Sequence, residues 1–457
     1  MASNPAATTI PAVRRHSPEP ANSGLRRVLQ LRDLALLIVG TVIGSGIFLV
    51  PALVLKTVGG SIVLAVTAWL LGGILSLLGG LTYGELSASN PEAGGLYVYI
   101  RDSFGPLPAF LFGWVLFFVV STGSIATLAV AFSNYMTEIL PLGVWTGKII
   151  SLLLICLIAF INVRGTRQSA NVQNFATVIK VLAIMAMAGA LLWFGSASRI
   201  VSVQSAGAVS IHSQFSALAL ATIAVLWAYE GWQYATFAAG ESVNPRRDFP
   251  IAFTVGIFAL IALYILSNLG YLAALGPLDV ANSSHVASTA LSATVSPSLG
   301  KAVTLAILLS IFSAANSIML TAPRVYFAMA RDGLFVRKLA DVHPRFGTPS
   351  FAVIATAFWA SLLAATGTFE QLLTYVVFVG WSFYALAAAS IFMYRARETA
   401  AAQGRYRVPG YPWTPIAFIV AVAALVVTTI MAQPGRAAIG LAVVLTGCPA
   451  YFIWRRR

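Results

Sequence analysis

The chain has 457 residues, of which 59% are hydrophobic and only 9% charged, and its mean hydropathy is +0.86. This composition excludes a soluble globular protein and indicates an all-α polytopic membrane protein. The net charge of +14 would suggest nucleic-acid binding in a soluble protein. Here the basic residues lie in short loops between apolar runs, so no nucleic-acid partner is expected.

Residues 1–28 are rich in Pro, Ala and Ser and lack the apolar core of a signal peptide, which predicts a disordered cytoplasmic tail. The rest, residues 29–457, is expected to form a single transmembrane domain. Its two cysteines, Cys156 and Cys448, lie in apolar runs and have neither the placement for an extracellular disulfide nor metal-ligand spacing. With no glycine-rich phosphate loop and no catalytic cluster at membrane depth, we predict no cofactor, no metal and no enzymatic activity.

Apolar runs long enough to cross a bilayer recur twelve times. They fall at about 34–56, 60–83, 107–136, 147–163, 170–195, 215–240, 250–275, 298–328, 350–366, 370–394, 413–432 and 436–454. Loops on one side carry groups of basic residues, such as Arg164 with Arg167, whereas the other side carries single ones, such as Lys148. The positive-inside rule then places both termini in the cytoplasm.

The first run is interrupted by Gly44-Ser45-Gly46. These residues make a poor helix interior, and lipid cannot satisfy the backbone groups of a broken helix, so the break is expected to line a cavity. The half-helix beginning near Ile47 would offer free N–H groups and its positive dipole end to a carboxylate. The alternative is that the glycines only allow close helix packing.

The sixth run contains a second interruption, Trp227-Ala228-Tyr229-Glu230-Gly231. The half-helix ending there would present unpaired carbonyls to an ammonium group. Two breaks of opposite polarity predict a site for a zwitterion, most simply a free α-amino acid. Trp227 or Tyr229 could cover the ligand as a gate or could make ordinary core or lipid contacts. Glu230 could bind a cationic side chain, carry a proton, or pair within the protein.

The two breaks open two blocks of five runs, about 34–195 and 215–394, and two further runs follow at about 413–454. Interrupted helices at matching positions favour an inverted-repeat transporter with its site at the bilayer midplane.

Lys180 lies near the middle of the fifth run, too deep to reach the interface easily. Its ammonium must meet carbonyls or a carboxylate. We expect it to fill the place of a sodium ion in related architectures and to tie the first run to the eighth. A proton-coupling role or an interfacial position is the alternative.

Four motifs resemble the amino acid–polyamine–organocation superfamily and its L-amino acid transporter branch. They are Gly44–Phe48, Pro91–Tyr99 followed by Phe104-Gly105, Ala228–Trp232 and Arg324–Gly333, and the match covers about residues 30–400 in order. The resemblance implies a leucine-transporter-like fold of twelve transmembrane helices. Two inverted five-helix repeats precede two extra helices, and helices 1 and 6 are unwound at the midplane. It also implies sodium-independent L-amino acid transport by alternating access, often as obligatory exchange.

The resemblance also assigns roles by position in the motifs. Trp227 would be the gating aromatic, Phe378 and Trp381 would shape the side-chain pocket, and Lys180 matches the fifth-helix lysine of the branch. The groups that would bind the substrate carboxylate and amine are Val42, Ile43, Gly44, Ser45, Gly46, Ala228, Tyr229, Glu230 and Gly231.

Two departures from the family pattern bear on function. The loop at about 137–147 lacks the cysteine through which animal members join a heavy chain by a disulfide. We therefore expect no such partner and predict a stand-alone bacterial inner-membrane transporter whose contacts are its amino acid substrate and lipid. Glu230 replaces the small residue of members with large neutral substrates. The alternatives to exchange are proton-coupled symport and, in another class, a membrane amino acid sensor.

Overall fold

The computed structural model describes residues 24–137, 139–140, 143–201, 211–296, 299–366, 369–397, 406–432 and 434–455, and every structural statement concerns these residues. Most of the predicted N-terminal tail therefore lies outside them. The described chain is helical, and its extended backbone is limited to an isolated bridge between Leu29 and Ser242.

The helices of the first half follow the predicted runs closely. They are α1 (Leu31–Val42), α2 (Gly46–Thr57), α3 (Ile62–Ser89), α4 (Leu96–Phe104), α5 (Pro106–Val115), the π-helix η1 (Leu116–Val120), α6 (Ser121–Thr137), α7 (Val144–Arg164), α8 (Thr166–Phe194) and α9 (Ala197–Val201).

The second half begins with α10 (Ile211–Ala228), the 3-10 helix η2 (Trp232–Glu241), α11 (Pro245–Leu275), α12 (Pro277–Asn282) and α13 (Val286–Thr294). It continues with α14 (Leu299–Thr321), α15 (Pro323–Arg331), the 3-10 helix η3 (Arg337–Ala340), α16 (Ser350–Thr366), α17 (Phe369–Ala396), α18 (Trp413–Ala432), α19 (Pro434–Leu445) and α20 (Gly447–Arg455).

Among the described residues, nine helices are long and apolar enough to cross a membrane, or ten when the bent pair α1–α2 is taken as one span. Side chains that are exposed on these helices are mainly large and apolar, such as Leu153 and Phe160 on α7, because lipid rather than water surrounds them. The prediction of an all-α polytopic membrane protein is confirmed at this level.

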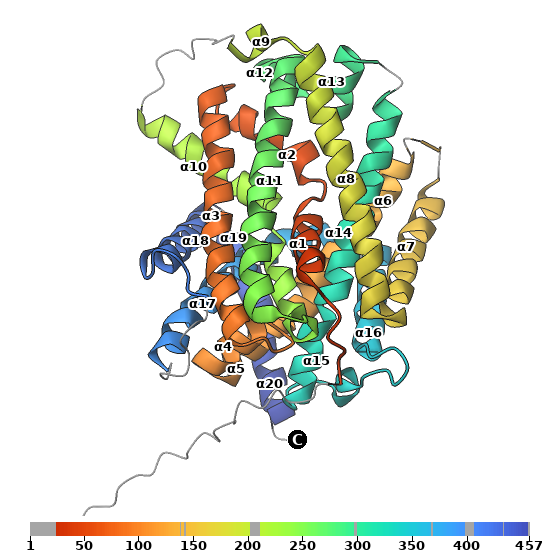
Figure 1. The fold of residues 1–457 in the computed structure, drawn as a ribbon, viewed down its shortest axis with the longest axis vertical. Helices are drawn as coiled ribbons and strands as arrows, with labels where there is room; N and C mark the ends of the chain where they lie inside the picture. Colours follow the sequence, from red (N-terminus) through yellow and green to blue (C-terminus); the bar gives the residue numbers. More distant parts are fainter. Residues whose placement is uncertain are drawn as a thin grey trace, which may run out of the picture.

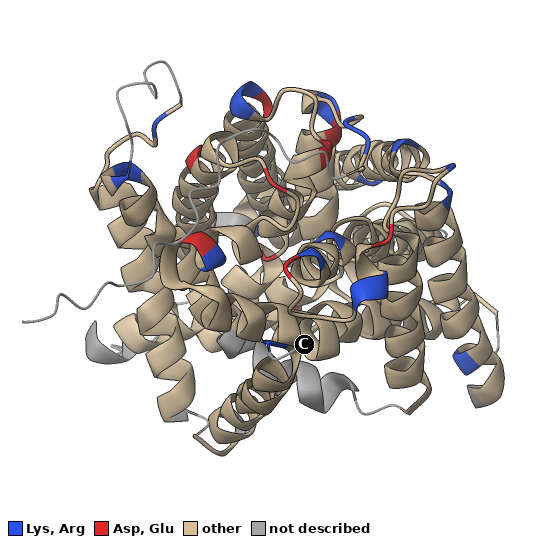
Figure 2. Cartoon of the chain, turned by 90° about the horizontal axis from the view of Figure 1, so that it is seen from below, with Lys and Arg blue, Asp and Glu red and all other residues tan. Residues whose placement is uncertain are grey.

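The pair α1–α2 runs through the middle of the bundle (Figure 1). Helix α1 packs against α8, α11 and α14, whereas α2 packs against α10 and α12. The short helices α9, α12 and α13 lie at the upper end of Figure 1, and α4, α15 and α20 lie at the lower end. In the view from below, charged residues lie mainly at helix ends and in connecting loops (Figure 2).

Helix α4 is a short helix that directly precedes the third predicted run. Its residues Leu96–Ile100 are buried, and it packs against α5 and α17, so it is a packed helix.

Candidate functional site

Ile43, Gly44 and Ser45 separate α1 from α2, whose axes differ by 47°, and Gly46 is the first residue of α2. The Gly44 N–H donates to the Val42 carbonyl at 2.9 Å, which closes the end of α1. Ser45 precedes α2 without a side-chain hydrogen bond to it, so the first turn of α2 has no side-chain cap. Gly44 and Ser45 are partly exposed, and a Cβ built on Gly44 would meet nothing within 4 Å. Space for a small ligand therefore adjoins uncapped helix N–H groups.

The second interruption lies between Ala228, the last residue of α10, and Trp232, the first of η2. Its three residues form a turn in which the Glu230 N–H donates to the Trp227 carbonyl at 3.2 Å. Gly231 has a φ of +127°, which favours glycine.

The two interruptions are in direct contact. A Cβ built on Gly46 would lie 3.1 Å from both Cα and Cβ of Ala228, and one built on Gly231 would lie 3.1 Å from the carbonyl group of Thr41. Both glycines are thus needed for the close approach, which brings α2 against α10 and α1 against η2. Close helix packing and the formation of a ligand site can therefore both explain the glycine at position 46.

The Lys180 side chain is only 1% exposed, so the alternative of an interfacial position is wrong. Its Nζ donates to the carbonyls of Gly40 at 2.6 Å and Ile43 at 2.7 Å. The ammonium thus satisfies two carbonyls at the end of α1 that lipid could not satisfy.

Lys180 ties α8 to α1, but the link to α14 is made by Ser310. The Ser310 hydroxyl donates to the Ile43 carbonyl at 2.9 Å and lies 3.3 Å from that of Gly44. The expectation that Lys180 itself reaches the eighth span is wrong, because both of its hydrogen bonds end on carbonyls of the first span, those of Gly40 and Ile43. Sequence reasoning missed Ser310, whose only sign is a hydroxyl in an apolar run.

Tyr264 of α11 connects the two breaks. Its hydroxyl lies 3.1 Å from the Ala228 carbonyl and 3.3 Å from the Val42 carbonyl. The expectation of unpaired carbonyls at the end of α10 is therefore wrong for Ala228, and also for Trp227, which accepts the Glu230 N–H. The tertiary partner from α11 could not be seen from the sixth run alone.

Glu230 and α17 form one wall beside the breaks. The Tyr384 hydroxyl donates to Glu230 Oε1 at 3.1 Å, and the Trp381 ring, which is 3% exposed, packs edge-on against Tyr384. Glu230 itself is partly exposed. Phe378 belongs to α17, but its side chain lies outside the described part of the chain.

The two aromatic residues of the second interruption differ in environment. The Tyr229 ring is buried between Trp69 and Tyr264, with centroid distances of 6.0 Å and 4.9 Å, so its side chain makes core contacts. Trp227 is 45% exposed and is not enclosed by protein in this conformation. Its role as a gate stays a prediction.

A buried ion pair closes the lower side of the breaks. Arg324 of α15 donates to Glu241 at the end of η2 at 2.6 Å, and both side chains are inaccessible. Thr166 at the start of α8 also donates to Glu241 at 2.6 Å. The Glu241 carbonyl accepts the N–H groups of Val28 and Leu29 just before α1. Four segments therefore meet at Glu241, which the sequence analysis did not single out.

A second, more exposed ionic cluster lies around Arg101 of α4. Burial alone would lower the pKa of Arg101, but Asp102, Asp332 and Glu92 outweigh it and raise that pKa above its ordinary value. The Tyr97 hydroxyl donates to Asp332 at 2.7 Å, and burial together with that carboxylate raises the pKa of Tyr97. This cluster holds α4 to the end of α15.

Apolar membrane-length helices around two touching helix breaks, braced by a buried lysine, define a membrane transport protein rather than an enzyme. The chain belongs to the amino acid permease family, whose sequence profile matches residues 29–449. This confirms the resemblance to the amino acid–polyamine–organocation superfamily, so the chain is a multi-pass membrane transporter for amino acids.

Individual relatives support the same assignment. The chain is 32% identical over 443 residues to the serine/threonine exchanger SteT of Bacillus subtilis, covering 95% of this chain and 98% of that one. It is 28% identical to the human large neutral amino acids transporter small subunit 2, over 96% of this chain and 83% of that one. It is 29% identical to the human cystine/glutamate transporter, over 94% of this chain and 85% of that one. The similarity to SteT and to these relatives confirms the L-amino acid transporter branch and its bacterial type.

Proposed function

We propose that the chain is a sodium-independent exchanger of L-amino acids that works by alternating access. The observation that carries this proposal is the Lys180 ammonium bonded to the Gly40 and Ile43 carbonyls, because a fixed positive charge at the break removes the need for a bound sodium ion. Three of its relatives are named as exchangers or transporters of amino acids, which supports the same function.

The membrane arrangement in this proposal has twelve spans. The ten candidates among the described helices are joined by the shorter α16 and by α17. Two inverted repeats of five spans precede α18 and α19–α20, and both breaks lie at the midplane. In this proposal the lower end of Figure 1 faces the cytoplasm of a bacterial inner membrane, because the basic loops follow the positive-inside rule, and both termini lie on that side.

In the proposed complex, the N–H groups of Ser45 and Gly46 bind the substrate carboxylate at the start of α2. Gly44, whose own N–H donates to the Val42 carbonyl, leaves the space for it. Carbonyls of Val42 and of the sixth-span segment from Ala228 to Gly231 bind the amine. The Ile43 carbonyl already accepts the Lys180 ammonium and the Ser310 hydroxyl, so Ile43 borders the amine without a free lone pair. Trp227, which is exposed one residue before the end of α10, closes over the ligand, and Trp381 with Phe378 borders its side chain. The partly exposed breaks above and the buried Glu241–Arg324 pair below fit an outward-facing state.

The exchange mode is tested with proteoliposomes. Unlabelled serine trapped inside is expected to accelerate uptake of labelled serine several-fold, and replacing external sodium by choline should change nothing. Equal uptake into empty and loaded vesicles would sink the exchange hypothesis. A pH gradient imposed on empty vesicles tests proton symport, which the partly exposed Glu230 carboxylate makes the second candidate.

Glu230→Gln is expected to weaken inhibition by lysine about tenfold relative to inhibition by serine, because a charge-assisted hydrogen bond to the ligand is lost. The measurement is a competitor series against labelled serine. Tyr384→Phe is the matched control, since it removes the hydroxyl bonded to Glu230 but keeps the carboxylate. If Glu230→Gln leaves the lysine-to-serine ratio as in the wild type, the carboxylate does not contact substrate side chains.

A covalently attached heavy chain is not part of this proposal, because the sequence between α6 and α7 has no cysteine.

A further inference from the structure

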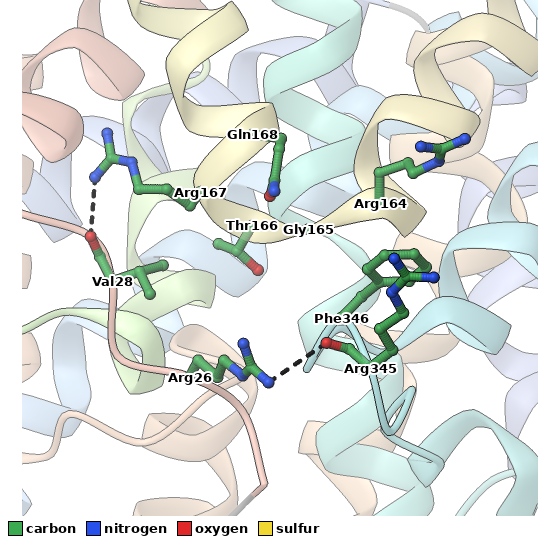
Figure 3. A pocket seen from close by; sticks show the side chains of 9 residues that line it. All are labelled: Arg26, Val28, Arg164, Gly165, Thr166, Arg167, Gln168, Arg345 and Phe346. Atoms are coloured by element: carbon green, nitrogen blue, oxygen red, sulfur yellow. Dashed lines mark hydrogen bonds between the residues drawn. The ribbon is translucent and has the colours of Figure 1, made fainter.

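A cavity of about 140 Å³ lies at the lower end of the molecule, away from the helix breaks. Three segments that are distant in sequence surround it, as Figure 3 shows. These are the chain just before α1, the corner between α7 and α8, and the loop that precedes α16. The proposed substrate site uses none of these residues.

The cavity is lined by four arginines and by no acidic residue. Only Arg167 has an ion-pair partner among the described residues, Asp33, at 2.7 Å. Arg26 donates to the Arg345 carbonyl at 3.4 Å. The guanidinium groups of Arg164 and Arg345 lie over phenylalanine rings at 4.6 Å and 5.5 Å, which leaves their N–H edges free for another acceptor. Three guanidinium groups of the lining, those of Arg26, Arg164 and Arg345, therefore have no ion-pair partner among the described residues.

The wall between Arg164 and Arg167 is the N-terminus of α8, a helix of 29 residues. Its N-cap is Gly165, which has no side chain to accept the N–H groups of the first turn. The Gln168 side chain folds back toward Gly165, so its amide also borders the cavity. Rotation of this amide would exchange its oxygen with its NH₂ group, which can donate to an anion. The helix dipole adds positive potential to that of the arginines.

The cavity also borders the lipid-facing side of α7. Phe160, one turn before Arg164, is 57% exposed, and Leu157 and Leu153 continue the same apolar face. Arg164 therefore stands where α7 leaves the hydrocarbon, at the depth of lipid headgroups. A cavity of this size accommodates a phosphate group, with acyl chains left to run along the exposed face of α7.

We propose that this cavity binds a phosphate group, carried by an anionic phospholipid of the cytoplasmic leaflet or by a soluble phosphate compound. Planar guanidinium groups and a helix N-terminus are the donors that phosphate prefers. The bound anion bridges Arg26, just before α1, to Arg345 and to the N-terminus of α8 at the α7–α8 corner, while Arg164 adds positive charge at the rim. The anion therefore links the chain before α1 to the α7–α8 corner and to the loop before α16. This link stabilises the state in which the lower end of the molecule is closed.

The test uses the full-length protein in nanodiscs of phosphatidylcholine, with phosphatidylglycerol then added. Native mass spectrometry counts bound phosphatidylglycerol, and the shift in melting temperature measures stabilisation. The double variant Arg26→Gln/Arg345→Gln is expected to bind about tenfold more weakly than the wild type. The control Arg246→Gln/Arg247→Gln removes two exposed arginines of the same face that do not line the cavity and should bind as the wild type does.

Inorganic phosphate and glycerol 3-phosphate form the second arm. Stabilisation of the wild type by these compounds, lost in the cavity variant, identifies a soluble ligand, whereas stabilisation by phosphatidylglycerol alone identifies a lipid. The cavity variant should melt like the wild type in pure phosphatidylcholine, because both replaced side chains are exposed. Equal responses of the cavity variant and the control to all three compounds would overturn the proposal.

Discussion

Replacing Lys180 by methionine is expected to slow exchange by about 10- to 100-fold. The ammonium is buried and donates to the carbonyls of Gly40 and Ile43. A methionine fills similar space but leaves the Gly40 carbonyl without that donor, while Ile43 keeps its bond from Ser310. A hydrogen bond to a charged group contributes about 1.5–3 kcal/mol, and each 1.4 kcal/mol corresponds to about a factor of ten.

The measurement is serine exchange into proteoliposomes, together with serine binding to the purified protein. Lys148→Met is the matched control, because Lys148 donates to the Ala365 carbonyl at an exposed position far from the breaks. Ser310→Ala should give a smaller loss than Lys180→Met, since Ile43 then keeps its bond from Lys180. Wild-type exchange and binding in a folded Lys180→Met protein would show that transport does not require the lysine.

Several features could be predicted from the sequence because they depend on short stretches of chain. Predicted apolar runs coincide with the nine helices of membrane length and with the bent pair α1–α2 among the described residues, since burial of backbone groups in lipid forces each run into a helix. Gly44-Ser45-Gly46 lies at the junction of α1 and α2 because it is the weakest helix former in its run. Lys180 was recognisable because a charge so deep in an apolar run needs a partner.

Other features depend on contacts between distant segments. Tyr264 and Ser310 each place one hydroxyl on the breaks, and a lone hydroxyl in an apolar run is common enough to carry no prediction. Sequence reasoning treated the carbonyls of Trp227 and Ala228 as unpaired because it considered the sixth run in isolation. Lys180 was expected to tie the first span to the eighth. Both of its partners, Gly40 and Ile43, belong to the first span, since its position along α8 does not determine which neighbour the side chain faces.

The Glu241–Arg324 ion pair also depends on contacts between distant segments, and the free energy of unfolding depends on it strongly. Both residues are charged and fall near the ends of apolar runs, where snorkelling to the interface is the ordinary expectation. Instead both side chains are inaccessible, because η2 directs Glu241 into the junction of α8, α15 and the chain before α1. The Glu241 carboxylate stabilises the closed lower end of the molecule only while its hydrogen-bond and ion-pair partners are present.

Arg324→Gln is therefore expected to lower the free energy of unfolding by about 3–5 kcal/mol, since the Glu241 charge stays buried without its ion-pair partner. The double variant Glu241→Gln/Arg324→Gln should lose much less than the sum of the two single variants, because no uncompensated charge remains. Thermal and denaturant unfolding in detergent measures both. Opening of the lower end should also be easier in the single variants, as labelling of a cysteine introduced at Leu29 would detect.

Asp332→Asn is the matched control. Asp332 pairs with Arg101 at 2.9 Å, but both side chains are partly exposed, and Arg101 keeps Glu92 and Asp102 as partners. Such a change should cost no more than about 1 kcal/mol. If Arg324→Gln and Asp332→Asn have similar effects, or if the two changes at the buried pair add, burial does not couple Glu241 to Arg324. Closure of the lower end would then depend on the backbone bonds from Val28 and Leu29 to Glu241.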